Sequence, residues 1–223
     1  IHKQLEEKVL LNTCVKKIIK VEKGYEIICQ NGIIKCHQIV STLPAHVLAN
    51  VIEDKKLSNN LNKIEYTPID VFHFGFDAKN IHNSKKGFGL LTKPSDNKNY
   101  LGILFSSQIF NHCCPKNKAF YTVLVGGERQ KEICKKPIDK VQKIIQKELE
   151  ELLNHQGKVT FSKAFRWEKG IPQYNLNQNE LAICIKKFEK DNDNFHVLGN
   201  YIGGISVSDC IKKGQKLAHK LIN

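Results

Sequence analysis

The 223-residue chain combines 41% hydrophobic with 26% charged residues, ordinary values for a globular protein that exclude a disordered or fibrous chain. Its formal net charge of +13 rests almost wholly on lysine, because arginine occurs only at Arg129 and Arg166. The lysines are scattered along the chain and arginine, the side chain best shaped to hold phosphate, is nearly absent, so nucleic-acid binding is not expected.

The cysteines and the start of the chain limit the class of protein further. Eight cysteines are present without a CxxC pair, and neither His112-Cys113-Cys114 nor Cys36-His37 has a second pair at zinc spacing, so no metal site is predicted. Reduced thiols in a cytoplasmic protein are expected. No run approaches the ~18 to 20 apolar residues that span a bilayer. The chain lacks Met and opens on Ile1-His2-Lys3, which we interpret as a fragment or a matured piece.

The first predicted element is a β-hairpin. Residues 25–29 and 33–36 are β-prone runs joined by Asn31-Gly32, a residue pair that strongly predicts a two-residue turn. Residues 39–43 then form a short apolar strand that ends at a proline, and residues 45–52 are predicted as a helix.

The middle of the chain is predicted as strands followed by one long helix. Residues 54–64 are polar and rich in Lys and Asn, and we interpret them as a crossover between domains. Strands are predicted over residues 70–76, 87–92, 100–107 and 119–126. Pro137 opens a helix with one apolar stripe at three- and four-residue steps, formed by Ile138, Val141, Ile144, Ile145, Leu149, Leu152 and Leu153.

The C-terminal part carries the most informative segment. A strand over residues 158–166 is followed by a loop that contains residues 170–174, then by a strand over 195–201 and a helix over 207–222. Paired glycines precede this helix. Glycine lets the backbone approach a ligand closely, and free N–H groups at a helix start favour an anion or an electron-rich group. A tight turn without a ligand is the alternative reading of this pattern.

Four segments in order resemble the protoporphyrinogen oxidase family. Residues 199–211, Gly-Asn-Tyr-Ile-Gly-Gly-Ile-Ser-Val-Ser-Asp-Cys-Ile, resemble its C-terminal FAD-binding motif. Residues 39–45, Ile-Val-Ser-Thr-Leu-Pro-Ala, are similar to its strand leading back to the flavin domain, and Arg166-Trp167 with Ile171-Pro172-Gln173-Tyr174 resembles the segment before the last flavin motif. The family's substrate-domain strands resemble residues 87–91, 101–107 and 123–129.

The resemblance implies an α/β (α+β) fold, the C-terminal part of a two-domain flavoprotein. Residues 1–55 and 166–223 would form a discontinuous FAD domain, and residues 56–165 a sheet-based substrate domain. The family begins with a G-x-G-x-x-G unit that holds the pyrophosphate, and this chain has none, since Gly87-Phe88-Gly89 is followed by Leu-Leu-Thr. The resemblance therefore implies that an N-terminal half is absent and that this chain alone is incomplete.

The activity that the resemblance implies is oxidation of proto- or coproporphyrinogen to the porphyrin in haem synthesis, with FAD as cofactor and O2 as acceptor. The sequence does not choose between the two substrates. An amine oxidase or desaturase of the same superfamily, and a non-catalytic relic, are the alternatives. A homodimer and a peripheral membrane association through the absent half stay open.

The resemblance also places the cofactor on particular residues. Gly203, Gly204, Ile205 and Ser206 would line the flavin at the helix start, whose positive end stabilises the reduced, anionic ring. Val15 would lie on the adenine side, with an ordinary strand valine as the alternative. Trp167 would contact the flavin, with core or interdomain packing as the alternative. No catalytic acid or base is assigned. Arg129 and the scattered lysines are candidates for the substrate's propionates, with surface solvation as the alternative for any one lysine.

Overall fold

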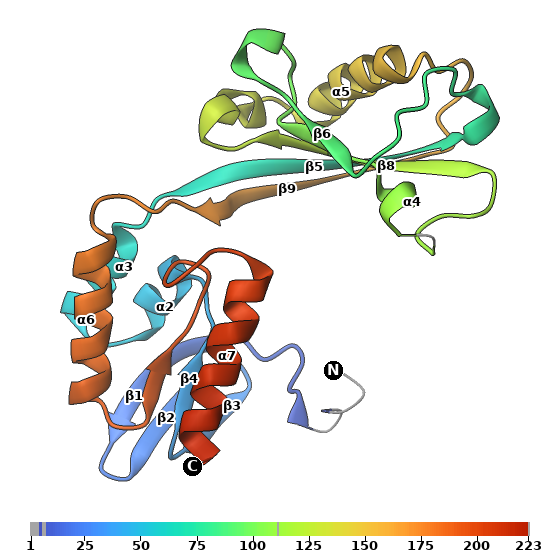
Figure 1. Ribbon diagram of the computed structural model, residues 1–223. Coiled ribbons are helices and arrows are strands. Elements are labelled where there is room, and N and C mark those ends of the chain that lie inside the picture. Colours follow the sequence, from blue (N-terminus) through green and yellow to red (C-terminus); the bar gives the residue numbers. More distant parts are fainter. Residues whose placement is uncertain (1–4, 6–7, 111, 223) are drawn as a thin grey trace. The chain divides into compact units, whose positions relative to one another are not determined.

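The computed structural model describes residue 5 and residues 8–110 and 112–222, so the opening Ile1-His2-Lys3 lies outside the described residues. The chain divides into two compact units, each with helices and sheets, which confirms the α/β (α+β) class (Figure 1). Unit 1 comprises residues 1–65 and 172–223, and unit 2 comprises residues 66–171. The units change over after residues 65 and 171, later than the domain boundaries expected after residues 55 and 165.

Unit 1 begins with a three-stranded antiparallel sheet of order β1-β2-β3, made by β1 (Val15–Val21), β2 (Gly24–Cys29) and β3 (Gly32–Cys36). The predicted hairpin is confirmed, but Cys29 pairs with Gly32, so Gln30 and Asn31 form the turn and Gly32, with a φ of 140° that favours glycine, begins β3. Tyr25 fixes this sheet to the rest of the unit: its hydroxyl donates to the carbonyl of Asp193 at 2.7 Å, and its ring meets Phe195 edge-on.

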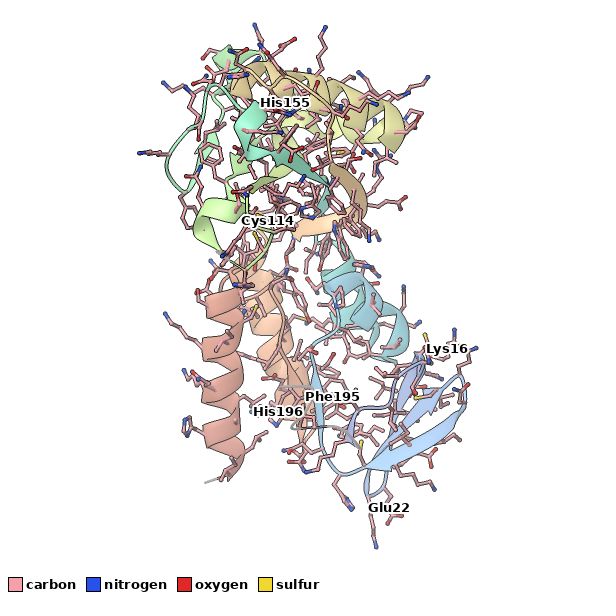
Figure 2. All side chains as sticks on the ribbon, turned by 90° about the vertical axis from the view of Figure 1, so that its right-hand side faces the viewer. Lys16, Glu22, Cys114, His155, Phe195 and His196 are labelled. Atoms are coloured by element: carbon pink, nitrogen blue, oxygen red, sulfur yellow. The ribbon has the colours of Figure 1, made fainter. Side chains whose placement is uncertain are left out.

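A second sheet in unit 1 pairs β4 (Ile39–Ser41) in parallel with β10 (Phe195–Val197). Figure 2 labels Phe195 and His196 on β10. The helices of the unit are α2 (Ala45–Val51), α3 (Lys55–Asn62), α6 (Gln178–Asp191) and α7 (Val207–Ile222). The predictions of α2 and α7 are confirmed, whereas α6 had not been predicted at all.

The prediction of residues 54–64 as a polar crossover is wrong, because α3 occupies most of that segment. Asp54 caps the helix by accepting a hydrogen bond from the N–H of Leu57 at 2.7 Å. Leu57 and Leu61 lie four residues apart on one face and are fully buried. Two apolar side chains and one cap are enough here to form a helix from an otherwise polar sequence.

Unit 2 is built on a five-stranded sheet of order β6-β7-β8-β5-β9. Its strands are β5 (Tyr66–Asp77), β6 (Gly89–Leu91), β7 (Gly102–Leu104), β8 (Lys118–Gly126) and β9 (Phe161–Pro172). The strand predicted over 100–107 is shorter than expected, because helix α4 (Ser106–Ile109) begins within that range. The predicted strand at 158–166 continues as β9 through Gly170, where a loop had been expected.

Helix α5 (Ile138–Leu153) covers one face of this sheet, as Figure 1 shows. It starts directly after Pro137, as predicted. The fully buried side chains at this interface are Phe72, Phe74 and Phe76 from β5 and Val141, Ile145, Leu149 and Leu153 from α5. Burial of each such side chain contributes about 1.5–3 kcal/mol, so this layer is the core of unit 2.

A buried ion pair joins β9 to β5. The carboxylate of Asp70 is fully buried and accepts hydrogen bonds from Nε of Arg166 at 2.8 Å and from Nη2 at 2.6 Å. The remaining Nη1 donates to the carbonyl of Lys136 at 2.9 Å. Three hydrogen bonds from the guanidinium of Arg166 thus hold the edge strand in place.

Candidate functional site

The loop between β10 and α7 contains the two glycines singled out in the sequence. Gly203 and Gly204 have φ values of 65° and 115°, which residues other than glycine rarely adopt. Ile205, which follows them, is 41% exposed. The loop therefore offers bare backbone at the start of a 16-residue helix, as a ligand-approaching segment requires.

Lys213 holds the inner side of this loop. Its ammonium donates hydrogen bonds to the carbonyl of Gly199 at 2.6 Å, to that of Gly204 at 2.9 Å, and to that of Ile202. An ammonium has three protons, so all its donors point at loop carbonyls.

Ser206 caps α7 in a reciprocal arrangement with Asp209. The Ser206 hydroxyl accepts from the N–H of Asp209 at 3.1 Å, and the Asp209 carboxylate accepts from the N–H of Ser206 at 3.2 Å and from its hydroxyl at 2.6 Å. This is a capping box with aspartate at the third helical position. The hydrogen bonds from Ser206 lower the pKa of Asp209. The expected cap at Ser206 is therefore present, and its N–H is already engaged.

Tyr174 and Gln178, from the segment that leads into α6, also hold the loop. The Tyr174 hydroxyl accepts from the N–H of Gly204 at 3.0 Å and donates to the carbonyl of Asn200 at 3.0 Å. The amide of Gln178 donates to the carbonyl of Tyr201 at 3.3 Å. Side chains from α7 and from the segment that enters α6 thus fix the conformation of the same loop.

The predicted site residues lie on three elements of the two units. Gly203, Gly204, Ile205 and Ser206 form one continuous segment at the start of α7. Val15 begins β1, also in unit 1, where it is half-buried and pairs with Cys29 of β2. Trp167 lies on β9 in unit 2, with 59% of its surface exposed.

A groove of about 450 Å³ opens beside Gly203, between α6, β10 and α7. Its apolar walls include Ile185, Val197 and Leu217, and lysines from α6 and α7 stand around it. Helix α7 buries none of its residues, and Val207 and Ile222 are among its exposed apolar side chains.

The sheet of unit 2 has an open face, opposite α5. Alternate residues on a strand share a face, and Thr122 of β8 pairs with both His73 of β5 and Leu104 of β7. Leu91 of β6, 87% exposed, belongs to the same face through its pairing with Gly102. The exposed apolar side chains of this face, called here the open face, are Leu91, Leu104, Phe161, Phe165 and Trp167.

His73 lies near the middle of the open face in a small polar network. Its Nδ1 lies 3.0 Å from the hydroxyl of Thr122, which lies 2.9 Å from that of Ser106. The imidazole stacks on Phe120 and meets Phe165 edge-on. Burial, together with the charge of Lys163, lowers the pKa of His73. The imidazole is therefore neutral at physiological pH.

Other candidates from the sequence are placed elsewhere. The guanidinium of Arg129 donates to the carbonyl of Thr92 at 3.0 Å and to its hydroxyl at 3.1 Å, so it holds a loop in unit 2. Cys114, labelled in Figure 2, donates to the carbonyl of Lys118 at 3.4 Å.

Within the described ranges, no three His, Cys, Asp or Glu side chains converge as a metal site would need. No helix among them is long and apolar enough to cross a bilayer.

Comparison with known proteins agrees with these features. The family of flavin-containing amine oxidoreductases matches residues 1–222. The chain belongs to this family. The family's members contain flavin, which implies FAD as the cofactor.

Relatives within the family carry more specific names. The chain is 32% identical to the mitochondrial protoporphyrinogen oxidase of Nicotiana tabacum over 75% of its length and 34% of the relative's. It is 30% identical to protoporphyrinogen oxidase 2 of Arabidopsis thaliana over 83% of its length and 38% of the relative's. The coproporphyrinogen III oxidase of Staphylococcus aureus is 21% identical over 95% of the chain and 46% of the relative. The chain thus spans less than half the length of these relatives.

Solved structures show the same fold. A protein of Exiguobacterium sp. 255-15, provisionally named a protoporphyrinogen oxidase, matches 94% of the chain and 46% of its own with a TM-score of 0.79 at 15% identity. A redesigned putrescine oxidase matches 99% of the chain and 50% of its own with a TM-score of 0.72 at 11% identity. The fold is therefore shared by proteins whose names indicate different substrates.

Proposed function

We propose that the protein oxidises a porphyrinogen, proto- or coproporphyrinogen, to the corresponding porphyrin, with FAD as cofactor and O2 as electron acceptor. In this proposal unit 1 belongs to the FAD domain and unit 2 binds the substrate. The observation that carries the proposal is the open face, an exposed layer of leucine and aromatic side chains on an otherwise well-packed sheet. The names of the relatives point in the same direction.

The flavin end of the cofactor fits the loop before α7. Gly203 and Gly204 leave room for close approach, because a ligand meets backbone there and no Cβ. The N-terminus of α7 adds a partial positive charge toward an electron-rich ring. When bound, FAD would supply the hydride acceptor and would pass the electrons to O2, giving H2O2. Conversion of a porphyrinogen removes six electrons and six protons and so consumes three O2.

The open face fits a large tetrapyrrole that carries carboxylate groups. Its leucines and aromatic rings would contact the apolar surface of the macrocycle. Lys163 lies among them, with its ammonium 5.0 Å from the ring centre of Phe165. Amines and carboxylates form charge-assisted hydrogen bonds, which are about twice as strong as neutral ones. Lys163 is therefore proposed to bind a propionate, the role that the sequence had offered to Arg129.

The test is steady-state turnover of the purified full gene product on protoporphyrinogen and coproporphyrinogen, followed by porphyrin fluorescence. Turnover of one of them supports the proposal and decides the substrate. Turnover of putrescine but of neither porphyrinogen would replace it with an amine oxidase.

The substrate surface is tested by Lys163→Met, with Lys147→Met on the exposed side of α5 as the matched control. Lys163→Met should raise KM for the porphyrinogen about tenfold, which corresponds to the loss of one charged hydrogen bond. Lys147→Met should leave KM unchanged. Equal KM values in the two variants would remove Lys163 from the substrate site.

A further inference from the structure

The lysine beneath the loop is placed by helix geometry. Lys213 lies in the second turn of α7, and side chains on a helix lean toward its N-terminus. The ammonium accordingly reaches back under the loop to the carbonyls of Gly199, Ile202 and Gly204. A lysine this far into a surface helix would ordinarily extend into water, yet this one is half-buried and fully hydrogen-bonded.

The three carbonyls decide where the neighbouring N–H groups point. In a trans peptide the C=O of one residue and the N–H of the next are antiparallel. Because the carbonyls of Ile202 and Gly204 point at Lys213, the N–H groups of Gly203 and Ile205 point away from it. Within the part of the chain that the structure describes, neither of these two N–H groups donates a hydrogen bond. The N–H between them, that of Gly204, is taken by Tyr174.

The same arrangement puts a positive charge behind the outward N–H groups. The ammonium of Lys213 and the N-terminus of α7 have the same sign, and the carboxylate of Asp209 in the first turn offsets part of it. A positive field favours the more negative of two states of a bound group, here the reduced flavin over the oxidised one.

We propose that Lys213 is the positioning residue for the flavin end of FAD. It draws the loop carbonyls inward, so that the N–H groups of Gly203 and Ile205 meet the electron-rich edge of the ring, and its charge favours the reduced cofactor. The inference rests on the proposed placement of the flavin at this loop.

The test compares Lys213→Met and Lys213→Arg with the wild-type gene product, with Lys216→Met, a lysine in the next turn, as the control. FAD affinity is measured by flavin fluorescence, the midpoint potential by spectroelectrochemistry, and loop order by hydrogen exchange of the peptide over 199–206 in the apoprotein. Lys213→Met should bind oxidised FAD about tenfold more weakly and reduced FAD about a hundredfold more weakly. That difference makes the midpoint potential about 30 mV more negative for a two-electron couple.

Lys213→Arg separates the charge from the geometry. Its planar guanidinium keeps the charge but cannot direct three donors at three converging carbonyls as an ammonium does. The potential should stay at the wild-type value while hydrogen exchange of the loop becomes faster, and this variant decides the question if Lys213→Met does not fold. Lys216→Met should match the wild type in every measurement.

The outcomes distinguish this inference from the proposed function. A wild-type protein that binds FAD, with Lys213→Met unchanged in affinity, potential and exchange, would overturn the role of Lys213 alone. A wild-type protein that binds no FAD would overturn the proposed function. Hydrogen exchange in the apoprotein would still decide whether Lys213 orders the loop. Unchanged exchange in both Lys213→Met and Lys213→Arg would refute that role of Lys213.

Discussion

Replacing Gly204 by valine should abolish FAD binding by distorting the loop itself. At a φ of 115°, a residue with a Cβ is strained by about 1–3 kcal/mol. The new Cβ would also lie 2.5 Å from Cγ of Asp209, closer than any stable contact, so Asp209 must leave the cap of α7. Valine at this position therefore meets Asp209 of the protein before it can intrude on a ligand.

Gly203 provides the variant that reports on the ligand. Its φ of 65° lies in the left-handed region that asparagine also adopts, and its Cβ would meet only Cδ of Lys213, at 3.4 Å. Gly203→Asn should therefore lower the free energy of unfolding by less than about 1 kcal/mol. Its side chain would nevertheless project from the loop where the flavin is proposed to approach. FAD affinity should therefore fall by more than the small loss of stability can explain.

Urea unfolding followed by circular dichroism and titration with FAD separate these effects in the full gene product. We expect Gly204→Val to lose about 1–3 kcal/mol of stability together with FAD binding. Gly203→Asn should lose FAD affinity and keep its stability. Wild-type FAD affinity in Gly203→Asn would refute close approach of the cofactor, and wild-type stability in Gly204→Val would refute the steric argument.

Three further predictions concern unit 2. Asp70→Asn removes the counter-charge of the Arg166 guanidinium, whose side chain is 24% exposed, and should cost about 1.5–3 kcal/mol in urea unfolding. Burial lowers the pKa of His73 in the folded protein below its usual 6.5, so at pH values between the folded and unfolded pKa the unfolded chain binds more protons. Stability should therefore fall as pH drops below about 6.5, and His73→Gln should weaken that dependence in thermal melts at several pH values. Replacing both Cys113 and Cys114 by serine should leave the FAD content and the metal content unchanged, as measured by absorbance and elemental analysis.

Each of these has a control or a contradicting result. Lys135→Met breaks the exposed ion pair with Glu132 and should cost less than about 1 kcal/mol, and a similar loss in Asp70→Asn would show that the buried pair is not important. An acid dependence that is unchanged in His73→Gln would assign it to other groups. Loss of stoichiometric zinc from the double serine variant would show a metal site that the described residues do not reveal.

The elements predicted correctly from the sequence are those whose signal is local. The Asn-Gly pair between two β-prone runs predicts the hairpin of β2 and β3, although its turn lies one residue earlier, at Gln30-Asn31. Pro137 followed by a complete apolar stripe predicts α5. Helix α6 carries a comparable stripe, formed by Leu181, Cys184, Ile185 and Phe188 at steps of three and four, so the sequence contains a local signal for this helix too.

Other features depend on the tertiary structure. Helix α3 shows only two apolar residues and is stabilised by packing, with Asn60 donating to the sulfur of Cys184 on α6 at 3.6 Å. In the loop before α7, the glycines and the cap at Ser206 could be read from the sequence. The contacts of Lys213 and Tyr174 could not, because they depend on how the loop folds back over the helix and on a segment nearly thirty residues earlier in the chain.

The half-reaction under anaerobic conditions tests the central claim most directly. The full gene product, purified with FAD, is mixed with protoporphyrinogen or coproporphyrinogen in the absence of O2, and the visible spectrum is followed. We predict that the bound flavin is bleached, that porphyrin fluorescence appears with it, and that admitting O2 restores the oxidised flavin band. A bound flavin whose spectrum neither porphyrinogen changes would contradict the account.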